Sequence, residues 1–120
     1  MPFYPTTLKT RWYMEGVCDS IHASLEGAKH WTAHWYDNNV EREAYIRAFT
    51  RCQSIVRHHD LQPDKMLQAL DEFHDDVVTR ETLRPRWYTL TRWVRDPAEA
   101  EEQAVRVAFS IVDSIAKRFL

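Results

Sequence analysis

The scarcity of glycine is the feature that most limits the folds open to this chain. Only two of its 120 residues are glycine, Gly16 and Gly27. A β-sandwich or β-barrel of this length needs many tight turns, and glycine is the residue that takes turn conformations without steric cost. A Rossmann-type or P-loop phosphate site likewise needs glycines clustered around the phosphate. The sequence therefore excludes these folds and sites.

Apolar residues instead recur at helical spacing over most of the chain. The first predicted helix is capped by Thr6 or Thr7 and ends at Asp37-Asn38-Asn39, and we expect Gly16 and Gly27 inside it to mark close packing or a bend. Its predicted core stripe consists of Leu8, Trp12, Val17, Ile21, Leu25, Ala28, Trp31 and Trp35.

Further helices are predicted over about 40–59, from Pro63 onward, over about 85–95, and after Asp96. Asp96 caps the last helix, and Pro97 takes its first position. The predicted core positions of the long helices are Tyr45, Ala48 or Phe49, Cys52, Ile55, Val56, Met66, Leu70, Phe73, Val77, Val105, Ala108, Ile111 or Val112, Ile115 and Phe119. Short connections between such helices predict an all-α fold, a single-domain antiparallel bundle of four to five helices over residues 1–120.

The composition is that of a soluble globular protein, with 44% apolar and 28% charged residues and a net charge of -2. The slightly acidic balance argues against a general polyanion binder, so any contact with nucleic acid has to be local. No signal peptide or membrane span is apparent, which predicts a cytoplasmic protein with no membrane partner. The two isolated cysteines, Cys18 and Cys52, are expected to be buried and unpaired.

The segment from Arg80 to Arg95 holds five arginines, two tryptophans and a single acidic residue, Glu81. Trp87 and Trp93 are six positions apart, about 240° around a helix, so one helix face cannot bury both rings. Arginines beside an exposed ring suit phosphate contacts with base stacking, or a protein hot spot. The plainer alternative is a short helix with one tryptophan in the core and a solvated rim of arginines. The predicted binding residues are Arg84, Arg86, Trp87, Arg92, Trp93 and Arg95, extended by Arg47, Arg51 and Arg57 if their helix packs alongside.

Other clusters of polar residues have a simpler explanation than a metal site. His30 and His34 are four residues apart, a spacing at which two imidazoles can share a metal. A dimetal bundle also needs Glu-x-x-His on two helices, and this motif is absent. The acidic run from Asp71 to Asp76 fans around its helix. We therefore expect solvated surfaces, with no metal and no cofactor.

Arg51 and His58 have a spacing similar to that of the Arg-x(4–6)-His motif of the HEPN ribonucleases, which are also small helical bundles. The match departs at Cys52, because that motif usually has a polar residue directly after the arginine. The leading prediction is a non-enzymatic accessory subunit of a nucleoprotein complex that contacts nucleic-acid phosphates through a basic-aromatic face. The alternative is a protein-only interaction module, such as a phage- or plasmid-encoded inhibitor or an assembly chaperone. A metal-dependent or HEPN-like enzyme comes third, and a homo-oligomer is left open.

Overall fold

The computed structural model describes residues 8–36, 39–82 and 97–119. Within them the chain forms four α-helices and no strand. The helices are α1 (Leu8–Ala33), α2 (Asn39–His58), α3 (Pro63–Thr82) and α5 (Pro97–Phe119). The all-helical prediction is confirmed, and the third and last long helices begin at Pro63 and Pro97 as predicted. The short helix predicted over 85–95 and the Asp96 cap lie outside the described residues.

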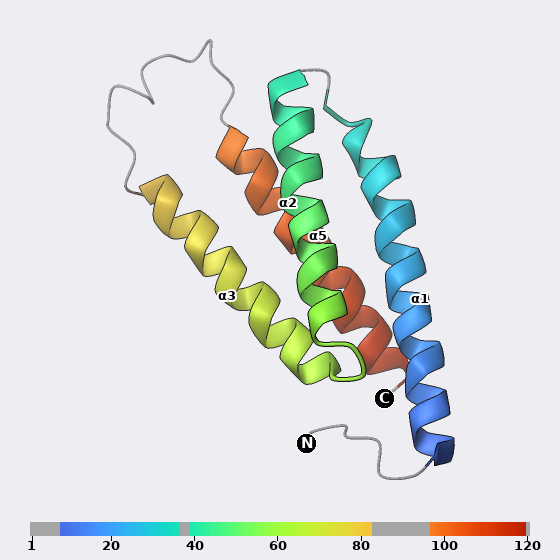
Figure 1. The fold of residues 1–120 in the computed structure, drawn as a ribbon. Helices are drawn as coiled ribbons and strands as arrows, with labels where there is room; N and C mark the ends of the chain where they lie inside the picture. Colours follow the sequence, from blue (N-terminus) through green and yellow to red (C-terminus); the bar gives the residue numbers. More distant parts are fainter. Residues whose placement is uncertain (1–7, 37–38, 83–96, 120) are drawn as a thin grey trace.

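Helix α5 is the element around which the others assemble. It contacts α1, α2 and α3, whereas α1 and α3 each contact only α2 and α5 among the described helices. Figure 1 shows α1 and α3 on opposite sides of the α2–α5 pair. Each of the two outer helices therefore has one face toward the core and one face that no described helix covers.

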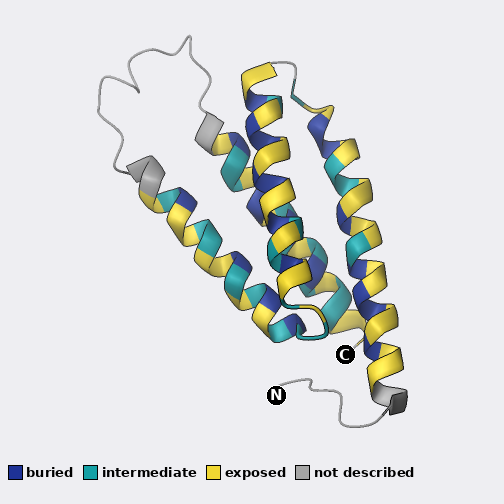
Figure 2. Cartoon of the chain, viewed as in Figure 1, coloured by how far each residue is buried: buried dark blue, intermediate teal, exposed yellow. Residues whose placement is uncertain are grey.

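The core forms where large side chains of α2 meet small side chains of α5. Tyr45 and Phe49 are fully buried, with ring centroids 5.7 Å apart. Ala104 and Ala108 on α5 are buried as well, and their short side chains let α2 approach closely. Figure 2 shows the buried residues on the sides of the helices that face one another.

The predicted core stripe of α1 is wrong at its tryptophans. Trp12 and Trp31 are each 74% exposed, and Trp35 is 64% exposed. The reason is angular for two of them, because the step of five from Trp12 to Val17 turns the helix by about 140°, and the two steps of three from Leu25 to Trp31 turn it by about 120°. Trp35 lies beyond the end of α1. Val17, Ile21 and Leu25 of the predicted stripe are buried, and the inward face also includes Met14, Cys18, Thr32 and Ala33.

The predictions for the other helices agree with the structure at most positions. Ala48 and Phe49 are both buried, and Val112 is buried more deeply than Ile111. The other buried positions that were predicted are Tyr45, Cys52, Val56, Met66, Leu70, Val77, Val105 and Ala108, while Ile55, Phe73 and Ile115 pack against the core half-buried. The prediction that Phe119 is buried is wrong, because Phe119 is the last residue of α5 and is 44% exposed.

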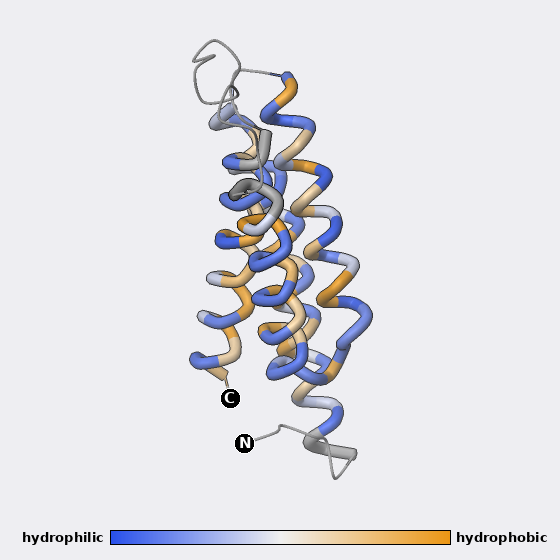
Figure 3. Tube along the Cα trace, turned by 90° about the vertical axis from the view of Figure 1, so that its left-hand side faces the viewer, coloured by the Kyte–Doolittle hydropathy of each residue, from blue (hydrophilic) through white to orange (hydrophobic). Residues whose placement is uncertain are grey.

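Hydrophilic and hydrophobic positions alternate along each described helix (Figure 3).

Cys18 and Cys52 are both buried and unpaired, as predicted. Burial raises the pKa of Cys18 from 9.0 to about 11 and that of Cys52 from 9.0 to about 12. Among the described helices, none is both long and apolar enough to cross a bilayer.

The described connections are made without glycine. Between α2 and α3, Leu61 takes a φ of 67°, a conformation that glycine usually supplies. Between α1 and α2, the Arg42 guanidinium donates to the carbonyl oxygen of Tyr36 from Nε at 3.0 Å and from Nη2 at 2.5 Å. The arginine thus ties the start of α2 to the chain that leaves α1.

Candidate nucleic-acid interface

The outward surface of α2 carries a local excess of positive charge. From Ala44 to His59 the sequence contains three arginines, two histidines and no acidic residue, in a chain whose net charge is -2. The three arginines are Arg47, Arg51 and Arg57, and all are exposed. No acidic residue lies within this stretch, and the nearest one on α2 is Glu43, one turn before Arg47.

These three arginines also differ from other surface cations in their contacts. Arg11 pairs with Glu15 at 3.4 Å, and Arg106 pairs with Glu102 at 2.6 Å. Within the described part of the chain, the guanidinium groups of Arg47, Arg51 and Arg57 make no ion pair or hydrogen bond. Their donors therefore remain available to an external anion.

Helical geometry divides the three arginines into two groups. At about 100° per residue, Arg47, Arg51 and His58 fall within roughly 40° of one another, and the row that they form is about 16 Å long. Arg57 is rotated by at least about 80° from each of the three and lies on the side toward α1. The row and Arg57 border two different hollows.

The first hollow lies between α2 and α3 and has a volume of about 380 Å³. Arg51, His58 and His59 line it from the end of α2, and Phe73 and Asp76 line it from α3. The two histidine rings contact edge to face, with centroids 4.9 Å apart. The hollow thus offers one permanent cation, two imidazoles and an aromatic wall, which is the chemistry that phosphate contact and ring stacking use. It also holds the Asp76 carboxylate, whose negative charge opposes an anion.

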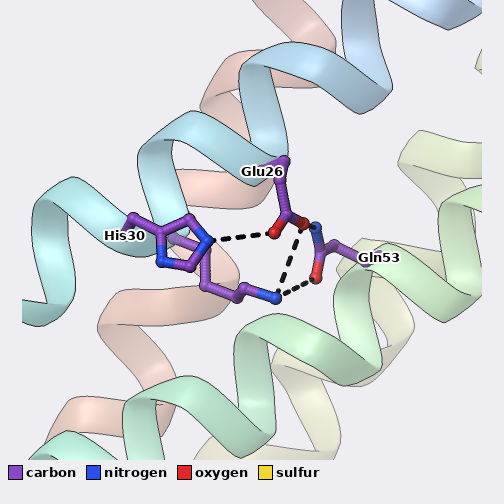
Figure 4. Close-up of polar contacts among 4 residues, drawn as sticks. Glu26, His30 and Gln53 are labelled. Carbon is purple, nitrogen blue, oxygen red and sulfur yellow. Dashed lines mark hydrogen bonds and ion pairs between the residues drawn. The ribbon is translucent and has the colours of Figure 1, made fainter.

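The second hollow lies between α1 and α2, with a volume of about 350 Å³, and Arg57 and Lys29 both line it. Figure 4 shows the polar cluster at its edge. Gln53 donates from Nε2 to Glu26 Oε2 at 2.7 Å, and Lys29 Nζ donates to Gln53 Oε1 at 3.2 Å. Lys29 Nζ also lies 3.5 Å from Glu26 Oε2, and His30 Nε2 lies 3.1 Å from Glu26 Oε1.

Glu26 is the negative centre of this cluster. Its pKa is lowered by the hydrogen bond from Gln53, then by the contact with His30 and by the nearby charge of Lys29. The carboxylate is therefore ionised at neutral pH and compensates the Lys29 ammonium group. Arg57 is left as the uncompensated cation of this hollow.

The main part of the predicted site, Arg84, Arg86, Trp87, Arg92, Trp93 and Arg95, lies outside the described residues. Arg80 belongs to α3, but its side chain is also outside what the structure describes. The two described helix ends that flank this segment, at Thr82 and Pro97, lie at the upper end of Figure 1, where α2 also begins. Of the predicted residues that are described, Arg47 and Arg51 lie on the same face of α2 as His58, Arg51 and His58 line one hollow, and Arg57 lines another.

Three contributors to these hollows were not predicted from the sequence. His59 was not among the predicted binding residues, although it directly follows His58, the last residue of the row on α2. Lys29 and Gln53 were missed because their meeting depends on how α1 and α2 pack, which no local pattern encodes. Among the described residues, no group of three or more His, Cys, Asp or Glu side chains is arranged to hold a metal ion.

No protein-family profile matches the chain, and no curated protein or solved structure gives a match either.

Proposed function

We propose that this protein is a non-enzymatic subunit, built as an antiparallel helical bundle, that contacts the phosphates of a nucleic acid in a larger complex. The observation that carries the proposal is the set of three exposed arginines on α2 that have no carboxylate partner in the described chain. The segment from Arg80 to Arg95 belongs to the proposal as well, because its sequence contains five more arginines and two tryptophans.

Three physical arguments support this function. A guanidinium group presents a planar set of donors that matches phosphate oxygens, and it stays protonated at any physiological pH. Nucleic-acid binding depends mainly on such phosphate contacts, so a local cationic surface suffices in a chain with a net negative charge. The acid-free stretch from Ala44 to His59 provides this local surface without requiring a basic protein overall.

A titration with a labelled oligonucleotide tests the proposal. Duplex and single-stranded probes are compared at several salt concentrations near the physiological value. The proposal predicts measurable binding whose affinity falls as salt rises, because each neutralised phosphate releases condensed counterions. Absence of binding to both probes at low salt would refute it.

A second candidate function, a protein-only interaction module, is favoured by a different observation. Trp12 and Trp31 on α1 and Trp35 just after it are mostly exposed, and large exposed aromatic side chains are typical of protein interfaces. This candidate predicts that the arginines of α2 have no affinity for nucleic acid. The same titration therefore separates the two functions.

A further inference from the structure

The outward face of α1 has a composition that burial within the chain does not explain. From Trp12 to Trp31, eight residues fall within an arc of about 100°, and they are Trp12, Tyr13, Gly16, Ser20, Ala23, Gly27, His30 and Trp31. All eight are exposed. The face therefore consists of a run of small residues with two ring side chains at each end, and we call it the α1 outer face.

Both glycines of the protein lie on this face. A Cβ atom added at Gly16 or Gly27 would meet nothing within 4 Å, so no close packing inside the chain requires either glycine. Glycine in the middle of a helix is unfavourable relative to alanine. The glycines therefore do not mark close packing within the described chain, contrary to one expectation from the sequence. A helix from another molecule, packed on this face, would provide that close packing.

The positions of the α1 outer face pair about the point between Ile21 and His22. On any helix, a two-fold axis perpendicular to the helix at such a point pairs positions in this way. In this chain three of the four pairs are also alike in residue type, because Trp12 corresponds to Trp31, Gly16 to Gly27, and the small Ser20 to the small Ala23, while Tyr13 corresponds to His30. Self-complementarity of this kind is what a two-fold symmetric contact between identical subunits requires.

A hollow of about 430 Å³ lies at one end of the face. It is lined by Trp12, Tyr13 and Gly16 from α1 and by Phe119 from the end of α5. The Tyr13 hydroxyl donates to the carbonyl oxygen of Phe119 at 2.6 Å, which fixes the wall of the hollow. In an antiparallel pair of α1 helices, this is the position that the Trp31 ring of the second copy reaches.

We propose that the α1 outer face binds a second copy of this chain, with the two α1 helices antiparallel and Gly16 of each opposite Gly27 of the other. The small residues allow the two backbones to approach closely, and each Trp31 ring enters the hollow beside the other copy's Trp12. This inference is independent of the proposed nucleic-acid contact, since it concerns a different face of the molecule.

The available area agrees with a stable dimer. Four tryptophan rings, two from each copy, would bury about 600–1,000 Å². A specific interface buries about 1,200–2,000 Å² in total. Tyr13 and Trp35, which are also at least half exposed, and the helix backbone at the glycines supply the remaining area. No Asp, Glu, Lys or Arg belongs to the α1 outer face itself, but Glu15 and Asp19 line the hollow at its end, where Glu15 pairs with Arg11 at 3.4 Å.

Sedimentation of the full chain between about 1 and 100 µM is the first test, because self-association follows mass action. We expect a dimer at the upper end of this range. Gly27→Leu should give a monomer with unchanged helical circular dichroism, since the added side chain meets nothing within its own chain. Gln103→Leu, at an exposed position of α5, should remain dimeric. A wild-type monomer at every concentration, or a dimeric Gly27→Leu variant, would overturn the proposal.

Disulfide trapping tests the orientation of the helices. Single variants Gly16→Cys and Gly27→Cys are mixed under oxidising conditions, and Cys18 and Cys52 stay unreactive because they are buried with raised pKa values. A disulfide needs Cα atoms within about 7 Å. The antiparallel arrangement predicts cross-linked dimers in the mixture and none in Gly16→Cys alone. Cross-linking of Gly16→Cys with itself and none in the mixture would show a parallel pair and contradict the proposal.

Discussion

The amide of Gln53 joins α2 to the Glu26 carboxylate of α1, with Nε2 of Gln53 2.7 Å from Oε2 of Glu26. Through this bond and the nearby Lys29, a negative charge is held at the edge of the hollow that Arg57 lines. The charge of Glu26 therefore moderates the cationic surface of α2 where that surface meets α1.

Replacing Glu26 should strengthen nucleic-acid binding. Glu26→Gln removes the carboxylate that compensates Lys29, so Lys29 becomes available for one further phosphate contact. We expect a higher affinity, and a log–log salt slope steeper by up to about one unit. Asp113→Asn is the matched control, because it removes an acid that pairs with Lys117 on α5, away from the interface. If Glu26→Gln and Asp113→Asn changed the affinity and the salt slope equally, the effect would come from net charge alone.

Leu25→Ala should destabilise the protein by roughly 2–5 kcal/mol, because Leu25 is fully buried on the inward face of α1. The neighbouring Ser24→Ala should change stability by less than about 0.5 kcal/mol, since Ser24 is exposed. Urea unfolding of both variants measures the difference. Similar costs at the two positions would contradict the assignment of the α1 core face.

The two thiols should make the protein less stable in alkali. The pKa of Cys18 is raised to about 11 and that of Cys52 to about 12, both by burial. Between the unfolded pKa, taken as the ordinary value of 9.0, and these values, the unfolded chain binds fewer protons, so stability falls as pH rises. Their contribution is complete below pH 9.0 and is lost by about pH 12.

Urea midpoints measured from pH 8 to pH 11 for the wild type and Cys52→Ala check this contribution. The variant is expected to show a shallower loss of stability above pH 9, because alanine does not ionise. Parallel curves for the two proteins would mean that the Cys52 thiol is not protected by burial.

The fold could be predicted from the sequence to a large extent, because helical periodicity and proline positions are local signals. Pro63 and Pro97 fixed the starts of two helices, and Phe49 and Leu70 marked core faces that the structure confirms. On α1, Val17, Ile21 and Leu25 are buried as predicted, and the prediction is wrong at the tryptophans, whose large apolar rings indicated core positions. Their burial depends on which side meets α2 and α5, and that is decided by packing.

The candidate site was less accessible to prediction. The charge of Arg47 and Arg51 could be predicted from the sequence. That neither arginine has a carboxylate partner among the described residues could not, because ion pairs depend on how neighbouring helices pack. The convergence of Arg51 and His58 with Asp76 of α3 in one hollow likewise needed the three-dimensional arrangement.

The hollow with Arg51 and His58 also permits a direct test of the enzymatic alternative. We expect a labelled single-stranded RNA to remain intact after prolonged incubation with the protein. Denaturing electrophoresis of the RNA gives the result. Cleavage that disappears in His58→Ala would establish a nuclease and displace the binding function.

The salt dependence of nucleic-acid binding tests the central claim most directly. The triple variant Arg47→Gln, Arg51→Gln and Arg57→Gln is compared with the wild type, and Arg11→Gln with Arg106→Gln serves as a control in which both arginines have carboxylate partners. On duplex DNA, the loss of three phosphate contacts should reduce the log–log slope by about 2.7 units, while the control keeps the wild-type slope. A slope for the triple variant equal to that of the wild type would contradict the assignment of α2 as the nucleic-acid interface.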